Sequence, residues 1–130
     1  MSDPLFHMVS GAPTPVAPFS HAVETDGWVF LTGQMPTLPG DDSATLPEGV
    51  QAQTRRVMDN LIIVLQGLGL GLKHVVSVRA YLTHFERDYG AMNETYRSYF
   101  SPHRLPARTC VGVTGLARGA LVEIDMVARR

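Results

Sequence analysis

Residues 75–83, Val75-Val-Ser-Val-Arg-Ala-Tyr-Leu-Thr83, decide the fold of this chain. Apolar side chains alternate along this segment, so one of its faces is strictly apolar, formed by Val76, Val78, Ala80 and Leu82. This period of two predicts a β-strand with one face in a hydrophobic core. Val75 and Tyr81 fall on the opposite face.

The segments on either side of this strand have the spacing of helices. From about residue 48, apolar residues recur at intervals of three and four, until glycines at 67, 69 and 71 end the pattern. Residues 88–100 place Met92 and several tyrosines close to one stripe, and Ser101-Pro102 ends this second helix. The tyrosines of the second helix are most simply explained as core residues.

The outer segments supply further strands. Residues 21–24 and 28–32 flank Asp26-Gly27, the favoured central pair of a two-residue hairpin turn. Residues 107–114 and 120–129 also have strand patterns, and the short loop between them predicts a second hairpin.

The resulting order β-β-α-β-α-β-β, with an optional short strand over residues 5–9, predicts a single domain over residues 1–130. Its class is α+β, with two helices on one face of a mixed sheet. The other face carries apolar residues, namely Val75, Tyr81, Leu121 and Val127. Because such a face is unfavourable in water, we expect other copies of the chain to cover it in a closed homo-oligomer.

The composition excludes several classes of protein. The chain has 130 residues, of which 45% are hydrophobic and 18% charged, values typical of globular proteins. Its formal net charge of −1 argues against nucleic acid or an anionic membrane as a partner. The single cysteine, Cys110, excludes an intrachain disulfide and predicts a reducing, cytoplasmic compartment. The first eight residues lack the pattern of a signal peptide, and residues 61–72, the longest nearly apolar stretch, are too short to span a bilayer.

The last predicted hairpin gathers polar side chains on the uncovered face. Residues that pair across two antiparallel strands share a face, which groups Arg108, Cys110 and Gly112 with Leu121, Glu123 and Asp125. A guanidinium binds a carboxylate through two parallel hydrogen bonds, and a nearby glutamate can move a proton or orient water. The residues alone also allow a plain interface ion pair between Arg108 and Glu123 or Asp125. Cys110 is equally compatible with a small hydrophobic role.

Other catalytic patterns are not found in the sequence. The five histidines lack the paired spacing of metal ligands, and one cysteine cannot supply a thiolate cluster, so we expect no metal site. There is no Gly-x-Ser-x-Gly nucleophile motif. Asn60 and Asn93 lie in helical stretches, where an asparagine is most often a surface or capping residue. The residues by themselves predict an oligomeric α+β domain with an arginine–carboxylate site.

Taken in order, the motifs of the chain resemble those of the RidA family (reactive intermediate deaminases, also called YjgF or L-PSP endoribonucleases). The resemblance covers nearly the whole chain, and it rests on many motifs at matching spacing rather than on any single one. These motifs are Pro18-Phe-Ser-His-Ala22, Val29-Phe-Leu-Thr-Gly-Gln34, Gln53-Thr54, Asn60-Leu61, the strand 75–82, Asn93-x-x-Tyr96, Phe100, Pro106-Ala-Arg-Thr-Cys-Val111 and Val122-Glu-Ile124.

The resemblance implies a chorismate-mutase-like α+β fold, assembled as a homotrimer with three pockets at the subunit interfaces. It also implies hydrolysis of reactive enamine or imine intermediates of the 2-aminoacrylate type to 2-keto acids and ammonia, without a metal or cofactor. In this family the arginine matching Arg108 holds the substrate carboxylate, and the glutamate matching Glu123 handles water and proton transfer. The substrate-binding positions carried over are Phe19, Gly33, Asn93, Arg108 and Cys110, with Gly33 and Cys110 contributing backbone groups.

Two residues depart from the family pattern. Phe19 stands where the family has a tyrosine, so a hydroxyl is missing while the ring remains, and Thr32 replaces a serine. Two alternative functions stay open at this stage. One is a non-catalytic trimer that senses small carboxylates such as 2-keto acids. The other is the ribonuclease activity in the family's older name, which the lack of a basic stripe disfavours.

Overall fold

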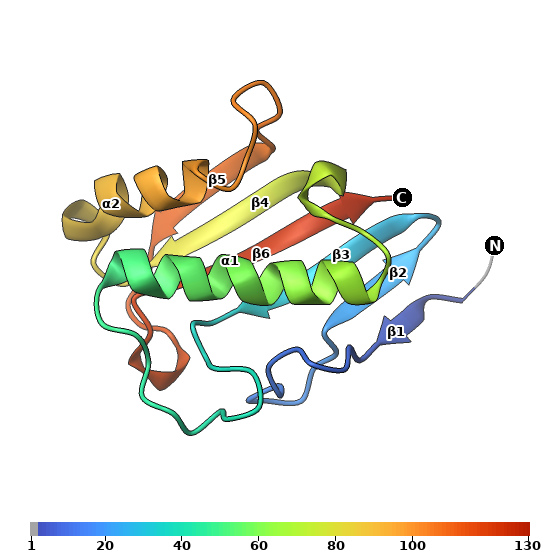
Figure 1. Ribbon diagram of the computed structural model, residues 1–130, viewed down its shortest axis with the longest axis horizontal. Coiled ribbons are helices and arrows are strands. Elements are labelled where there is room, and N and C mark those ends of the chain that lie inside the picture. Colours follow the sequence, from blue (N-terminus) through green and yellow to red (C-terminus); the bar gives the residue numbers. More distant parts are fainter. Residues whose placement is uncertain (1–2) are drawn as a thin grey trace.

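Six strands form one mixed sheet in the order β1-β2-β3-β6-β4-β5, and two α-helices lie on one of its faces (Figure 1). The computed structural model describes residues 3–130. Its elements are β1 (Leu5–His7), β2 (Ala22–Thr25), β3 (Trp28–Gln34), α1 (Val50–Gly67), the 3-10 turn η1 (Leu72–His74), β4 (Val75–Leu82), α2 (Phe85–Arg97), β5 (Ala107–Gly112), the 3-10 turn η2 (Ala117–Gly119) and β6 (Val122–Arg129). The predicted two-layer α+β class is confirmed.

The first hairpin forms as its turn residues predict. Asp26 and Gly27 both have positive φ angles, 51° and 81°, which is the backbone geometry of a tight two-residue turn between twisted strands. Thr25 pairs with Trp28 across this turn. The optional strand near the start of the chain is also present, because β1 pairs antiparallel with β2.

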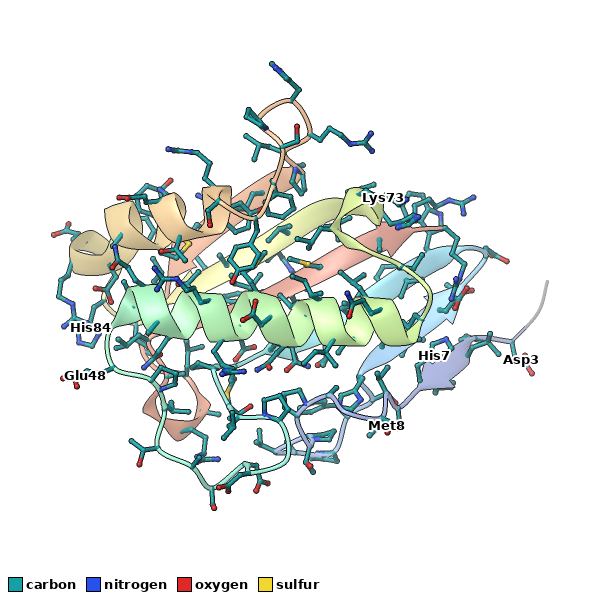
Figure 2. All side chains as sticks on the ribbon, viewed as in Figure 1. Asp3, His7, Met8, Glu48, Lys73 and His84 are labelled. Atoms are coloured by element: carbon teal, nitrogen blue, oxygen red, sulfur yellow. The ribbon has the colours of Figure 1, made fainter. Side chains whose placement is uncertain are left out.

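The two helices match their predicted positions with shifted ends. α1 ends at Gly67, and the positive φ of 75° at Gly69 allows the chain to reverse there. α2 begins three residues before the predicted residue 88, with Glu86 in its first turn, where a negative charge is favourable. In Figure 2, Glu48 lies before the start of α1 and Lys73 lies in η1, the turn that follows this helix along the chain.

One prediction about β4 is wrong. A register shift between Val75 and Ser77, opposite β6, breaks the alternation at the start of the strand. As a result Val75 lies in the core with 7% exposure, whereas Val76 is 43% exposed. From Val78 onward the predicted faces hold, with Val78, Ala80 and Leu82 fully buried under the helices.

The predicted last hairpin is also wrong. Among residues 3–130 the partner of β5 is β4, in parallel, while β6 lies antiparallel between β3 and β4. The β4-α2-β5 segment is therefore a crossover connection, in which α2 packs back on the sheet. This pairing reverses the face on which every β5 side chain lies, relative to the prediction.

The sheet face opposite the helices has no cover within the described chain. Phe30 and Trp28 are 47% and 42% exposed there, and the paired residue of Phe30, Val127, is half-buried. A contiguous apolar surface of this kind typically marks an interface. No helix in residues 3–130 has the length and apolar character needed to cross a membrane.

Asn60 connects α1 to the loop after β3. Its side chain is fully buried, and its Nδ2 donates hydrogen bonds to the carbonyl oxygens of Met35, at 3.0 Å, and Thr37, at 2.9 Å. Asn60 is therefore a structural residue rather than a surface or capping one.

We predict that Asn60→Ala lowers the free energy of unfolding by about 2–3 kcal/mol, because two buried carbonyls lose their donors. Gln66→Ala, at an exposed position on the same helix, should change stability by less than about 0.5 kcal/mol. Urea unfolding of both variants measures the difference, and equal stability of the two would contradict this role of Asn60.

Candidate functional site

Arg108 lies on the helix-covered side of the sheet, close to α2. Its register partner on β4 is Val78, a core residue, which fixes the side of the sheet. The guanidinium carbon lies 5.0 Å from the ring centre of Tyr96 and 5.9 Å from that of Tyr89. Nη2 also donates a long hydrogen bond of 3.5 Å to the Tyr89 hydroxyl. Two aromatic rings of one helix therefore position the guanidinium.

A cavity of about 320 Å³ opens beside Arg108. Its walls come from α2, the loop before β5, and β5 itself, and the lining residues are Tyr89, Asn93, Tyr96, Arg97, Leu105, Pro106 and Arg108. Two buried polar atoms of this group, Asn93 Oδ1 and the Tyr96 hydroxyl, have no hydrogen-bond partner within residues 3–130. A cationic fork next to polar groups and an apolar wall is suited to a small organic anion.

Cys110 follows two residues later on the same strand and the same face. Its side chain is half-buried and packs against the core. Burial raises the pKa of the thiol, and the nearby Arg108 charge only partly opposes this effect. The thiol is therefore neutral near pH 7, which fits a small packing side chain and not a nucleophile.

Glu123 lies on the opposite, uncovered face of the sheet. It pairs with Tyr81 of β4, and both side chains are half-buried there. Gly33 of β3 lies against it so closely that a Cβ at this position would collide with the Glu123 carboxyl group. Glycine at residue 33 therefore leaves room for this carboxyl group.

The surroundings of Glu123 favour its protonated form. Burial raises the pKa of the carboxyl group, and the negative charge of Asp125 raises it further. Asp125 accepts hydrogen bonds of 2.9 Å from Arg79 Nε and from the Tyr81 hydroxyl. A raised pKa makes the Glu123 carboxylate a stronger base than an ordinary glutamate, which suits a role in proton transfer.

Phe19 belongs to the same region as Gly33. Both line a hollow of about 20 Å³, formed with the proline-rich segment before β2 and the residues after β3. The Phe19 ring is 39% exposed, so it is available to a molecule that binds outside this small hollow.

The prediction that Arg108 and Cys110 share a face with Glu123 and Asp125 is wrong. Arg108, Cys110 and Asn93 lie with the helices, whereas Glu123, Gly33 and Phe19 form a second group that includes the uncovered face. The reason is the parallel pairing of β5 with β4. The alternative of an ion pair from Arg108 to Glu123 or Asp125 is not formed within the described chain, and Asp125 pairs with Arg79 instead.

The sequence interpretation missed residues of α2 that line the cavity. Tyr89, predicted as core, is 38% exposed and contacts Arg108, whereas Tyr96 is buried as expected. Tyr89, Asn93 and Arg97 are spaced by four residues, which places them on one helix face. This spacing is visible in the sequence, but it indicates a cavity wall only once β5 is known to lie beside this face of α2.

Metal ligands do not gather at either group of residues. Within residues 3–130, the structure has no set of three or more His, Cys, Asp or Glu side chains that could hold a metal ion.

The chain is thus a small α+β domain with an arginine cavity on one side of its sheet and a half-buried glutamate on the other. The sequence model of the family described as Endoribonuclease L-PSP matches residues 9–130. The chain belongs to this family, the one that the motif resemblance indicated.

Individual relatives support the same assignment. A RutC family protein of Synechocystis is 38% identical over 117 residues, which cover 90% of this chain and 89% of that protein. The 2-iminobutanoate/2-iminopropanoate deaminase of Mus musculus is 33% identical, over 90% of this chain and 84% of the mouse protein. The crystal structure of E. coli TdcF with bound serine superimposes with a TM-score of 0.85 at 27% identity, covering 95% of this chain and 98% of TdcF. The family therefore includes reactive intermediate deaminases.

The raised pKa of Glu123 has a consequence for stability. Because the folded-state pKa lies above the unfolded value, folding favours the protonated form, and stability is lost as the pH rises through the folded pKa. Glu123→Gln removes this loss. We predict that the free energy of unfolding of Glu123→Gln, relative to that of the original chain, is greater at pH 8 than at pH 4.

Urea unfolding at a fixed protein concentration measures this difference, since assembly also affects apparent stability. Glu94→Gln, an exposed glutamate on α2, is the matched control. If the difference in free energy of unfolding between Glu123→Gln and the original chain is the same at pH 4 and at pH 8, folding does not change the pKa of Glu123 in this way.

Proposed function

We propose that the chain is an imine deaminase that hydrolyses 2-imino acids of the 2-aminoacrylate type to 2-keto acids and ammonia. The observation that carries this proposal is the pair of complementary groups on one chain: an arginine cavity with unpartnered polar atoms, and a half-buried carboxyl group with a raised pKa. Imine hydrolysis needs both an anion receptor and a proton carrier, and the relatives include a 2-iminobutanoate/2-iminopropanoate deaminase.

The two groups require a second copy of the chain to meet. A symmetric dimer through the uncovered faces would bring Glu123 close to its own counterpart and leave the Arg108 cavity outside. A head-to-tail contact that closes into a ring instead places the Glu123 face of one copy beside the Arg108 cavity of the next. We therefore propose a homotrimer with three shared sites, in which the uncovered apolar face is buried between subunits.

Within such a site the substrate carboxylate binds the Arg108 guanidinium. The two parallel N–H groups of the fork match the two carboxylate oxygens, and the rings of Tyr89 and Tyr96 hold the fork in place. The Asn93 side chain lies in the same cavity wall, and a rotation that exposes its buried oxygen would let it accept a hydrogen bond from the imine N–H. Bound serine in TdcF supports a ligand of amino-acid size.

Glu123 then moves the protons of the hydrolysis. As the carboxylate, it accepts a proton from water while the water oxygen bonds to the imine carbon and the C=N π electrons pass to nitrogen. The same proton, now on Glu123, is given to that nitrogen. Glu123 then takes the hydroxyl proton of the resulting carbinolamine and passes it to the nitrogen, so that the C–N bond breaks, the keto group forms and NH3 leaves. No oxidant or reductant is involved, and the raised pKa allows Glu123 to act in both directions.

Two variants separate binding from turnover. Arg108→Lys keeps the charge but loses the fork, so we predict that both 2-oxobutanoate binding and turnover weaken, with turnover falling about 100-fold or more. Glu123→Gln should still bind 2-oxobutanoate, while turnover falls about 10²- to 10⁴-fold. Calorimetric titration measures binding, and ammonia release from imines made in situ by an amino-acid oxidase measures turnover.

Arg55→Lys and Glu94→Gln, at exposed positions on α1 and α2, control for the loss of each side-chain type. A non-catalytic carboxylate sensor would show no turnover in any form and tighter binding in Glu123→Gln. Equal turnover in the original chain and in Glu123→Gln would remove this residue from the reaction.

A further inference from the structure

The Arg108 cavity contains a second arginine. Arg97, in the last turn of α2, lines the same cavity of about 320 Å³. Neither Arg97 nor Arg108 forms an ion pair with a carboxylate among residues 3–130, whereas Arg79, Arg87 and Arg130 all do. Two uncompensated positive charges therefore face one small cavity.

Arg97 lies on the face of α2 that Arg108 contacts through Tyr89. Tyr89, Asn93 and Arg97 occupy one face of α2, at steps of about 6 Å along the axis. Arg108 reaches along this face as far as Tyr96, whose ring centre is 5.0 Å from its guanidinium carbon. Arg97 and Arg108 therefore both line this cavity.

The remaining wall is apolar and suits a short carbon chain. Leu105, which is 51% exposed, and Pro106 close the side of the cavity that faces the loop before β5. A ligand with a carboxylate on Arg108 and a few methylene groups against this wall would bring a second anionic group towards Arg97.

We propose that the preferred substrates are 2-imino dicarboxylates, with Arg97 binding the distal carboxylate. This inference rests on the proposed function, because it takes Arg108 as the receptor for the first carboxylate. Arg97 also interacts favourably with the C-terminal carbonyls of α2, a structural role that requires no ligand. The two roles differ in what they predict for ligand preference.

The test compares 2-oxoglutarate with 2-oxopentanoate, which have the same chain length and differ only in the distal carboxylate. Calorimetric titration of the assembled protein should show about 5- to 10-fold tighter binding of 2-oxoglutarate. In Arg97→Gln this preference should disappear, while the affinity for 2-oxopentanoate stays within about twofold of the original chain. Arg104→Gln, an exposed arginine outside this cavity, should keep the preference.

Turnover gives a second readout through the imines that amino-acid oxidases form from glutamate and from norvaline. In Arg97→Gln, turnover of the glutamate imine should fall relative to turnover of the norvaline imine. Equal affinity for both keto acids in the original chain, or a preference that survives in Arg97→Gln, would overturn the assignment of Arg97. Unchanged binding of both ligands in Arg108→Ala would overturn the proposed function itself, so the two failures are distinguishable.

Discussion

Successive side chains of a strand point to opposite faces of a sheet, and the arrangement of this site depends on that constraint. β5 pairs in parallel with β4, which turns Arg108 and Cys110 towards the helices. β6 pairs antiparallel with the same strand, and its register turns Glu123 towards the uncovered face. The sheet itself therefore separates Arg108 from Glu123 within one chain. A change of one residue in either register would exchange these faces.

The separation gives each group its own environment. Arg108 lies between aromatic rings, where cation–π contacts stabilise its charge without an acidic partner. Glu123 lies in a half-buried position beside Asp125, where its protonated form is favoured. If the two groups belonged to one face, they would form an ion pair, which would occupy the receptor and lower the pKa of the glutamate. Because they lie on opposite faces, Arg108 and Glu123 of one chain do not pair with each other.

Local sequence signals predicted much of the fold, and non-local pairing limited the rest. Asp26-Gly27 predicted its hairpin correctly because the turn conformation is set by those two residues. The pairing of β5 could not be derived in this way, since a short glycine-containing loop fits a hairpin but the crossover through α2 determines the partner. The bulge that moves Val75 into the core leaves no mark in the alternation of the segment.

The site shows the same contrast. Arg108 and Glu123 were identified from their chemistry and from a family resemblance, but the face on which each lies follows from strand pairing alone. The pKa of Glu123 depends on burial and on Asp125, which only the folded chain defines. The role of Tyr89 at the cavity became visible only with β5 placed opposite α2.

The central claim is that each site takes Arg108 from one copy and Glu123 from the next. The most direct test of this claim mixes the Arg108→Ala and Glu123→Gln variants, unfolds the mixture and refolds the two chains together. Each variant alone should release ammonia from an imine far more slowly than the original chain. In a ring assembled at random from equal amounts, about a quarter of the sites combine an intact Arg108 with an intact Glu123, so about a quarter of the activity should return. If the mixture stays as inactive as its components while forming the same oligomer, the two residues do not meet across a subunit interface.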